Sequence, residues 1–545
     1  MRGRTPFLLL MCALVVLAWW WPNRLQNPAG GGGAAKLNSL SYDPYRPGES
    51  PLTDHFATAA EVEQDFTLLA PVTRAVRTYA AFDGPYDIAA IAQRHGVRVW
   101  QGVWLGGNRA RNADEMARAI DLAHRYPDTI ERVVVGNEVL LRRDLPVAEL
   151  IADIDHVRAA VHQPVAYGDV PEFWDEFPQI VQHVDVVLIH LLPFWEDVPT
   201  GIGRAVAEVG AVYDHFAARF PGAKIAIGET CWPSRGRQRR DAVPGRVNET
   251  RFLRDFIALA AEKHFDYNFI EAFDQDWKYQ NEGVVGANWG ILTADRQPKI
   301  PLSGALREDP LWARHAAISL VCGLVLAWVG RRSTKARAAA VLAMILGAAL
   351  GLAWATTIPV LYDAHASLAA VVNLGGQALL AVLAMRRLAG AIPPAPWRTA
   401  ADATARVAAG LRLRRYPWAG LFEDICVVFA WTAAVEQMLL VFDPRYRDFP
   451  LPSFAVPLVV VVARAMQGDG FAGKAGRGEV CLALVLTGGA VASAVQEGWL
   501  NGQSLAWNAC VLVLAAPFWR QVWAGRAGRW ASRAGRPEEA VQGLR

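Results

Sequence analysis

The hydrophobic pattern changes in character at about residue 310. Beyond this point most of the chain consists of apolar runs that approach the about 20 residues a helix needs to cross a bilayer. Before it, short β-rich runs alternate with amphipathic helical stretches, and one further apolar run lies close to the N-terminus. The pattern therefore predicts a polar α/β domain joined to a membrane-embedded helical domain.

Eight segments are apolar enough to be membrane helices. They are Phe7–Trp21, Leu311–Gly330, Ala338–Leu361, Ala364–Met385, Leu421–Phe442, Phe454–Met466, Val480–Val495 and Leu505–Val522. We expect the first to serve, within residues 1–35, as an N-terminal anchor followed by a glycine-rich linker. The other seven form a seven-helix transmembrane domain over residues 311–525. Gly347 and Gly351, four residues apart, favour close packing of one of these helices.

The positions of the basic residues predict an orientation. Arg2 and Arg4 precede the first segment, and basic loops follow the second, fourth, sixth and eighth. The polar domain is then outside the cytoplasm, and the basic tail, residues 526–545, is inside. Only 7 of 55 basic residues are Lys, which is typical of a GC-rich bacterial genome, so the expected location is the inner membrane with a periplasmic domain.

The first segment admits two interpretations. It can be a cleaved signal peptide or a retained anchor. The sequence Trp19-Trp20-Trp21-Pro22 does not favour cleavage by a signal peptidase, which prefers small residues at its site. Small residues follow only at Pro28–Ala35. We therefore favour the retained anchor.

Within residues 36–310 the alternation predicts eight strand–helix units. The β-rich runs are Leu37–Ser41, Ala75–Tyr79, Arg98–Val103, Arg132–Gly136, Val165–Gly168, Val184–His190, Lys224–Gly228 and Tyr267–Phe273. Helical stretches between them include Ala59–Leu69, Asn112–Arg125, Leu145–Val161, Arg204–Phe220 and Asn248–Lys263. Strands separated by helices favour a parallel sheet, and eight units in about 275 residues match a (β/α)8 TIM barrel. An open, doubly wound sheet is disfavoured because no glycine-rich phosphate loop follows the first strand.

Composition and charge narrow the function. Hydrophobic residues make up 53% of the chain and charged residues 20%, below the about 25% of ordinary soluble proteins. Residues 36–310 hold 29 basic against 40 acidic residues, a net −11, whereas the remainder holds 26 against 12, a net +14. An acidic domain disfavours nucleic-acid binding. Cys231 is the one cysteine in this domain and no Cys/His cluster has zinc spacing, so neither a metal nor another cofactor is expected.

Candidate chemistry lies where the predicted strands end, which is where barrel enzymes carry their active sites. Glu138 follows the fourth strand and Glu229 the seventh, with aromatic residues nearby in the sequence. Cleavage of a glycosidic bond needs such a pair, since one carboxylic acid protonates the leaving oxygen and one carboxylate attacks or activates water. The pair therefore predicts a glycoside-cleaving site.

These residues also carry a resemblance to a known family. The segment Gly228–Gly236 reads Gly-Glu-Thr-Cys-Trp-Pro-Ser-Arg-Gly and is similar to the nucleophile signature of glycoside hydrolase family 17, usually Glu-Thr-Gly-Trp-Pro-Ser. The resemblance extends to further motifs over residues 36–300: Gly136-Asn137-Glu138, Phe273–Lys278 with Glu282 and Trp289-Gly290, Ser41-Tyr42-x-Pro44, and Val76-Arg77-Thr78-Tyr79. Cys231 and Gln275 depart from the pattern, where glycine and an acid are usual, and could alter the sugar subsites.

The resemblance implies a role for each matching residue. Glu138 would be the general acid/base and Glu229 the nucleophile of a retaining enzyme, with the carboxylates about 5–5.5 Å apart. Asn137 would bind the sugar 2-hydroxyl, and His190 would orient Glu229 or contact sugar unless it is a core histidine. Further candidates for substrate binding are Tyr79, Phe194, Trp195, Trp232, Trp277, Trp289, Asp276, Lys278 and Glu282. For the five Phe and Trp residues core packing is the alternative, and for the last three a role in pinning the loop.

The membrane half favours one function over its alternatives. A retaining glycosyl-enzyme is released by water or by a sugar hydroxyl, so the catalytic pair fits a β-1,3-glucan hydrolase and a transglycosylase equally well. An enzyme held at the membrane suits remodelling of an emerging glucan, and the loop Phe442–Pro450 resembles the membrane region of bacterial cyclic β-glucan synthases that carry family 17 domains. We therefore expect a transglycosylase that builds or branches β-1,3/β-1,6-glucan. A non-catalytic glucan-binding or export scaffold is the second alternative. The expected partners are β-glucan, the lipid bilayer and a glucan synthase or export machinery.

Overall fold

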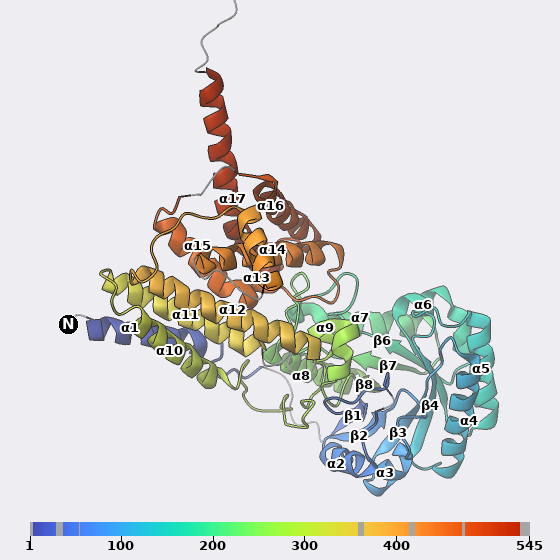
Figure 1. Ribbon diagram of the computed structural model, residues 1–545. Coiled ribbons are helices and arrows are strands. Elements are labelled where there is room, and N and C mark those ends of the chain that lie inside the picture. Colours follow the sequence, from blue (N-terminus) through green and yellow to red (C-terminus); the bar gives the residue numbers. More distant parts are fainter. Residues whose placement is uncertain are drawn as a thin grey trace, which may run out of the picture. The chain divides into compact units, whose positions relative to one another are not determined.

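The computed structural model describes residues 4–28, 36–53, 55–357, 364–413, 420–470 and 475–534, and it divides into two compact units (Figure 1). Residues 25–308 form a barrel unit. Residues 1–24 and 309–545 form a helical unit. Each unit has its own hydrophobic core.

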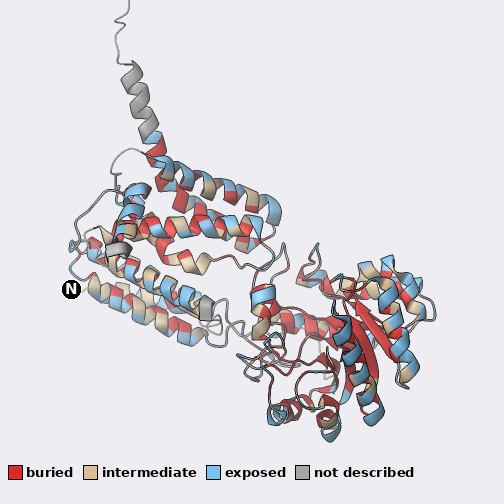
Figure 2. Cartoon of the chain, turned by 45° about the vertical axis from the view of Figure 1, so that its right-hand side comes forward, coloured by how far each residue is buried: buried red, intermediate tan, exposed pale blue. Residues whose placement is uncertain are grey.

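Eight parallel strands close the barrel in sequence order, and β8 returns to β1 through the pair Leu40 and Phe269. The strands are β1 (Leu37–Ser41), β2 (Thr73–Arg77), β3 (Arg98–Val103), β4 (Ile130–Asn137), β5 (Val165–Asp169), β6 (Val186–His190), β7 (Ile225–Thr230) and β8 (Tyr267–Phe269). The helices between them are α2 (Ala59–Leu69), α3 (Ile88–Arg94), α4 (Arg109–Arg125), α5 (Val147–Ala160), α6 (Pro171–Glu176), α7 (Ile202–Arg219) and α8 (Arg246–Lys263). The predicted TIM barrel is confirmed. Figure 2 shows buried strands inside helices whose outer faces are exposed.

The last strand is shorter than the sequence predicts. β8 ends at Phe269, although the apolar run continues to Phe273. Beyond the strand, Glu271 exchanges backbone hydrogen bonds with another segment, since its N–H donates to Trp289 O and its C=O accepts from Ile291 N. This segment follows η2 (Asp276–Lys278) and α9 (Tyr279–Gly286). The loop after β8 therefore folds back beside the strand end.

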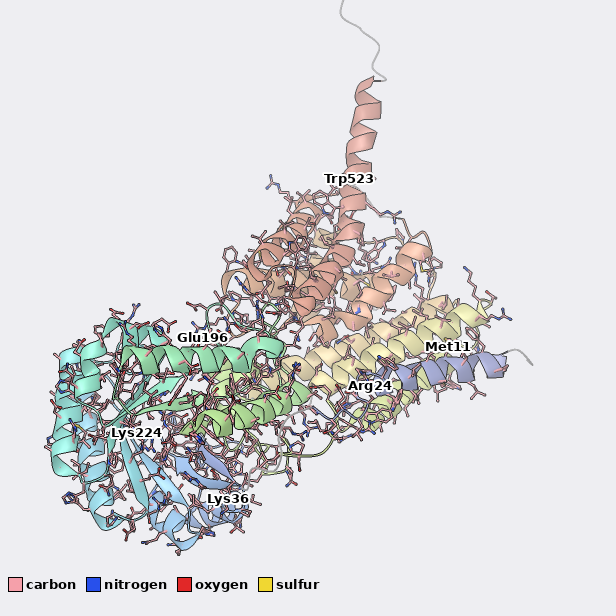
Figure 3. The ribbon with its side chains drawn as sticks, turned by 180° about the vertical axis from the view of Figure 1, so that it is seen from behind. Met11, Arg24, Lys36, Glu196, Lys224 and Trp523 are labelled. Atoms are coloured by element: carbon pink, nitrogen blue, oxygen red, sulfur yellow. The ribbon has the colours of Figure 1, made fainter. Side chains whose placement is uncertain are left out.

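Side chains that point into the barrel change from apolar to polar toward the carboxyl ends of the strands. One buried cluster fills the interior: Ala75, Trp100, Val134, Ala166, Val186, Leu188 and Ala226. Two residues further along β2 and β6, the inward positions are Arg77 and His190. Glycines on the strands flanking β6 make room for the histidine. A Cβ on Gly168 would lie 2.6 Å from His190 Nε2, and one on Gly228 would lie 2.7 Å from Cδ2. Figure 3 labels Glu196, after β6, and Lys224, before β7, which mark the carboxyl and amino ends of the strands.

Six helices of the described chain are long and apolar enough to cross a membrane. They lie in α10 (Trp312–Val329), α11 (Ala336–Thr357), α12 (Ala364–Leu388), α14 (Leu421–Phe442), α16 (Arg477–Glu497) and α17 (Gly502–Ala534). The first and sixth predicted segments are shorter apolar helices, Pro6–Trp20 within α1 (Arg4–Trp20) and Leu451–Met466, which includes α15 (Ala455–Met466). The sequence did not predict helix α13 (Ala400–Leu413). The third predicted segment beyond Thr357 and the tail beyond Ala534 lie outside the described residues.

Small residues bring α10 and α11 into backbone contact. A Cβ on Gly347 would lie 2.4 Å from Gly323 N, and one on Gly351 would collide with the Ser319 hydroxyl. Ser319 also accepts a 2.9 Å hydrogen bond from Trp19 Nε1 of α1. The predicted close packing of the two glycines is therefore used inside this chain, between neighbouring helices.

The Gly347→Ala variant tests this packing. The new methyl group must push the backbones of α10 and α11 apart, so we expect a loss of about 1–3 kcal/mol in the stability of the helical unit. Thermal unfolding of the full chain in detergent measures it. The matched control is Gly488→Ala in α16, where a Cβ meets nothing within 4 Å. Equal unfolding midpoints for the two variants would contradict the packing.

Candidate active site

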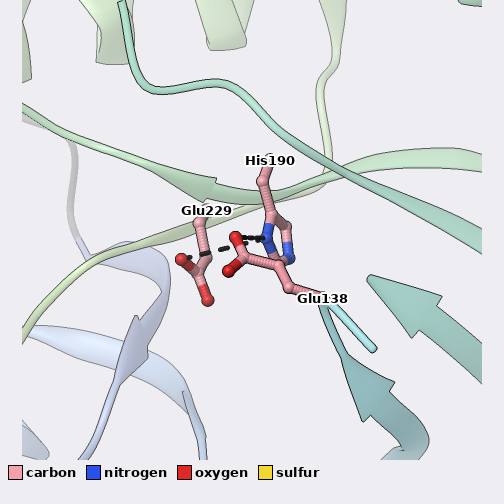
Figure 4. Close-up of side chains that lie close together, drawn as sticks. All are labelled: Glu138, His190 and Glu229. Atoms are coloured by element: carbon pink, nitrogen blue, oxygen red, sulfur yellow. Dashed lines mark hydrogen bonds and ion pairs between the residues drawn. The ribbon is translucent and has the colours of Figure 1, made fainter. Parts of the chain in front are cut away.

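Glu138, His190 and Glu229 come together at the carboxyl ends of β4, β6 and β7 (Figure 4). One carboxylate oxygen of each glutamate and a ring nitrogen of the histidine all lie within 4.8 Å of one another. His190 Nδ1 is 2.8 Å from Glu138 Oε1 and 3.9 Å from Glu229 Oε2. The histidine is fully buried, whereas the Glu138 side chain is 22% exposed. The separation of the two carboxylates fits the retaining geometry of about 5–5.5 Å and falls short of the 6.5 Å or more of inverting enzymes.

A buried arginine connects the two strands that carry the glutamates. Arg77 Nη1 donates to Glu229 Oε1 at 3.0 Å and to Gly228 O at 2.9 Å, and Nη2 donates to Asn137 Oδ1 at 2.6 Å. The Arg77 side chain is 1% exposed. Its charge therefore acts on Glu229 in an environment that water screens little. Since the amide oxygen of Asn137 is engaged, its NH₂ group remains to donate elsewhere.

Tyr79 holds the same oxygen of Glu229. Its hydroxyl donates to Glu229 Oε1 at 2.9 Å and lies 2.9 Å from Ser41 Oγ, which accepts from Asn268 Nδ2 at 2.8 Å. Because a carboxylate only accepts, donation runs from Asn268 through Ser41 and Tyr79 to Glu229. Burial, and next the charge of Glu229, raise the pKa of Tyr79 and keep it a donor. Glu229 Oε1 is thus fixed by two donors.

Glu138 occupies an unusual backbone position directly after β4. Its φ is 52°, in the left-handed region that non-glycine residues rarely adopt, and its N–H donates to Gly168 O at 2.8 Å. Strain of this kind is often found at functional sites. Burial alone would raise the pKa of Glu138, but the hydrogen bond and charge of His190, with Arg142 and Arg77, outweigh it and lower the pKa. The environment therefore favours the carboxylate form of Glu138.

Lys278 lies in η2, within the loop that follows β8, and buried carboxylates hold its side chain. Its ammonium donates to Glu271 Oε2 at 2.7 Å and lies 3.7 Å from Asp43 Oδ2. All three residues are buried. Burial raises the pKa of Glu271 to about 8, opposed by the charge of Lys278. This contact corresponds to the loop-pinning role that the sequence left open for Lys278.

Asp276 and Glu282 stay half-buried on the same loop and its helix α9. Burial raises the pKa of Asp276 to about 6, with help from the charges of Asp274 and Asp295. Burial also raises the pKa of Glu282; Lys278 opposes this shift, and Glu138 and Glu229 add to it. The charges of Glu138 and Glu229 therefore act on the Glu282 carboxyl group.

The five candidate aromatic residues divide by exposure. Phe194 and Trp232 are fully buried, with their rings 5.3 Å apart, and Trp232 Nε1 donates to Val243 O. Trp289 is 4% exposed and packs edge-on against Trp195 at 6.0 Å. Trp195 and Trp277 are half-buried. Trp195 and Trp277 therefore have exposed surface that a sugar could cover. Phe194, Trp232 and Trp289 pack in the core, which is the alternative role stated for them from the sequence.

Both departures from the family pattern have a structural role in this chain. Gln275 donates to Asp43 O at 3.0 Å and accepts from Trp277 Nε1 at 3.1 Å, so its amide orients Trp277. A carboxylate could accept but not donate. Cys231 is fully buried, with Sγ 3.7 Å from Trp232 O. It fills the core behind the end of β7.

Sequence reasoning missed several residues of the site. Arg77 was noted only within a motif, and Asp43, Glu271 and Arg142 were not singled out. A charged residue inside a predicted strand, as at Arg77, was the available signal, because a charge that points into a barrel needs a partner there. Glu271 gave a similar signal within the run Tyr267–Phe273.

The cluster of Glu138, His190 and Glu229 could also be considered as a metal site. Three of its possible donor atoms are already engaged, since Arg77 and Tyr79 hold Glu229 Oε1 and His190 Nδ1 bonds Glu138 Oε1. The Arg77 guanidinium already supplies positive charge beside Glu229. The set therefore suits paired carboxylates better than a cation.

A closed (β/α)8 barrel with two carboxylates facing each other at the ends of β4 and β7 has the architecture of a glycoside hydrolase. Comparison with known proteins agrees. Residues 39–290 match the family model of the BtgE/BtgC glycoside hydrolase domain, so the barrel is similar to the barrels of these glycoside hydrolases. The resemblance predicted from the sequence is confirmed.

Individual relatives match about half of this chain or less. A glucan 1,3-beta-glucosidase of Arthroderma benhamiae is 29% identical over 269 residues, covering 44% of this chain and 83% of that protein. One of Schizosaccharomyces pombe is 27% identical over 256 residues, covering 44% and 79%. The structure of a glycoside hydrolase family 17 beta-1,3-glucanosyltransferase from Rhizomucor miehei aligns at 26% identity, covering 50% of this chain and 99% of that one, with a TM-score of 0.44.

The Arg77→Met variant tests the bridge between the strands. It removes the donor to Asn137 Oδ1 and one of the two donors to Glu229 Oε1, together with the charge that balances this buried carboxylate, so we expect a loss of about 3 kcal/mol or more and a fall in the barrel's melting point of about 6 °C or more. The control is Arg94→Met, which removes an ion pair to Glu63 from a side chain that is 56% exposed. Such surface pairs are worth at most about 1 kcal/mol. Equal effects of the two substitutions would show that Arg77 is not a structural bridge.

Proposed function

We propose that the protein is a membrane-bound, retaining β-glucan-active enzyme, and specifically a transglycosylase that forms or branches β-1,3/β-1,6-glucan. The observation that carries this proposal is the close approach of Glu138 and Glu229, with oxygens within 4.8 Å. A double displacement needs this spacing, because the nucleophile must reach the sugar carbon whose leaving oxygen the acid protonates. The matched relatives, by their names glucan 1,3-beta-glucosidases, support a β-1,3-glucan donor.

Glu229 is the nucleophile in this mechanism. Arg77 and Tyr79 both hold Oε1, so Oε2 remains to attack the anomeric carbon. The new bond joins Oε2 to this carbon while the bond to the glycosidic oxygen breaks, and the bonding electrons go to that oxygen. The two fixed donors place the carboxylate before reaction, which lowers the cost of reaching the transition state.

Glu138 is the acid/base. It protonates the departing oxygen in the first step. In the second step it removes a proton from the incoming hydroxyl, whose oxygen bonds the anomeric carbon while the bond to Glu229 Oε2 breaks and its electrons return to the carboxylate. His190 holds Glu138 Oε1 and supports the carboxylate form that the second step requires. The amide NH₂ of Asn137, whose oxygen accepts from Arg77, binds the sugar 2-hydroxyl in this mechanism. Trp195, Trp277, Asp276 and Glu282 are the candidates for other sugar contacts.

Transfer is preferred to hydrolysis because of the helical unit. Six helices that could span a bilayer would hold the enzyme where a glucan emerges, and a secreted hydrolase has no need of them. The alternative is a β-1,3-glucan hydrolase of the same mechanism. A glucan-binding or export scaffold without catalysis is less well supported, since a scaffold has no use for a strained Glu138 and a doubly fixed Glu229.

The catalytic variants Glu229→Gln and Glu138→Gln test the mechanism in the full chain in lipid nanodiscs. With β-1,3-gluco-oligosaccharides we expect Glu229→Gln to abolish turnover, because an amide is not a nucleophile. Glu138→Gln should lower it about 100- to 10,000-fold but spare glycosylation by an aryl glucoside, whose leaving group needs no proton. The control is Glu176→Gln, at an exposed glutamate at the end of α6.

The products, followed by mass spectrometry and NMR, decide between the alternatives. Products longer than the donor with new β-1,6 signals support the transglycosylase, whereas only shorter, β-configured products favour the hydrolase. An active Glu229→Gln variant would contradict the catalytic mechanism.

The membrane placement is the second part of the proposal. Basic loops after alternate apolar segments favour the barrel in the periplasm, with the chain's end in the cytoplasm. In intact bacterial cells, we expect a membrane-impermeant thiol reagent to modify a cysteine introduced at the exposed Glu176. It should not modify one introduced at Arg332, which follows α10 and is also exposed. The reverse labelling pattern would invert the orientation.

A further inference from the structure

Trp104 is an aromatic residue at the barrel mouth that takes no part in the catalytic steps proposed above. It directly follows β3, and it continues the alternation of Trp100 and Gly102, of which Trp100 points into the barrel interior. Val103, the last residue of β3, pairs with Val135 of β4, three residues before Glu138. Trp104 is half-buried, in contrast to the fully buried Trp100. Its position therefore places an accessible aromatic side chain on the Glu138 side of the reacting pair.

Two buried side chains of α4 fix the loop that carries Trp104. Glu115 Oε2 accepts from Trp104 N at 3.2 Å and also from Ala81 N, in the loop after β2, at 2.7 Å. Asn112 accepts from Gly106 N at 2.9 Å and donates to Gly106 O at 2.8 Å. Glu115 and Asn112 are 1% and 3% exposed. The loop is therefore held in one conformation before any ligand arrives.

Arg142 supports the ring itself. Its guanidinium carbon lies 4.2 Å from the centre of the Trp104 ring. The same group donates to Leu105 O at 2.9 Å, to Asp144 Oδ2 at 2.7 Å and to Asn137 O. Arg142 thus ties the loop of Trp104 to the residue that precedes Glu138. A ring supported in this way loses little conformational entropy when a ligand covers it.

We propose that Trp104, supported by Arg142, is the stacking platform for the glucosyl unit on the leaving-group side, where the departing sugar and the incoming acceptor bind. This inference rests on the proposed function, because Glu138 marks the leaving-group side only if it is the acid/base. The apolar C–H face of a glucosyl ring packs on an aromatic face, while its hydroxyl groups remain available for hydrogen bonds at the rim. Trp104 would then determine how well an acceptor competes with water.

The test uses Trp104→Ala and Trp104→Phe in the full chain in nanodiscs, with laminaribiose as the acceptor. We expect Trp104→Ala to raise the acceptor concentration at half-maximal transfer about tenfold and to shift products toward hydrolysis. Trp104→Phe should restore much of the acceptor affinity. The control is Phe82→Ala, an exposed aromatic side chain on the neighbouring loop after β2.

A binding measurement separates this inference from the proposed function. In the Glu229→Gln background, calorimetry with a β-1,3-gluco-oligosaccharide reports affinity without turnover, and adding Trp104→Ala should weaken it about tenfold. Unchanged acceptor dependence and affinity in Trp104→Ala would overturn the Trp104 assignment and leave the catalytic pair intact. Oligosaccharide binding that depends on Trp104 without any turnover by the native protein would instead reject the proposed reaction and the leaving-group role together.

Discussion

The site depends on one buried guanidinium. Arg77 sits inside the barrel and bonds Glu229, Asn137 and the Gly228 carbonyl, so it joins the ends of β4 and β7 across the interior. A charge this deep is tolerated only with close partners, and here the partners are the site residues themselves. The space exists because Gly168 and Gly228 lack side chains where Arg77 and His190 lie. The same contacts of Arg77 therefore stabilise the barrel and place the carboxylates.

The two glutamates differ because their surroundings differ. Glu229 is buried and has one oxygen fixed by Arg77 and Tyr79. Glu138 is more exposed, has a strained backbone conformation and bonds His190. This difference matches the separate roles we propose, a nucleophile that must not move and an acid/base that must exchange protons. The helical unit is built by other means. Its glycines pack helix against helix, and its apolar surface suits a bilayer.

Local pattern was sufficient for the barrel and for the glutamate pair. Continuous apolar runs such as Val133–Val135 mark strands buried on both faces, and a glutamate at the end of such a run lies at the barrel mouth. The pattern was insufficient where a distant partner decides. β8 ends early because residues 289–291 bond Glu271, and the importance of Arg77 depends on Glu229, 152 positions away. The exposure of an aromatic ring also depends on tertiary packing, so sequence could not separate Trp232 from Trp277.

The central claim is that Glu229 forms a covalent bond to the sugar. The most direct measurement is to incubate the full chain with a 2-deoxy-2-fluoroglucosyl donor, which slows release of the glycosyl-enzyme, and to locate the added mass by peptide mass spectrometry. A retaining mechanism predicts one added fluoroglucosyl group, on the peptide that contains Glu229, and no labelling of the Glu229→Gln variant. Labelling of Glu138 or of another residue, or turnover of the donor with inversion and no labelled protein, would contradict it.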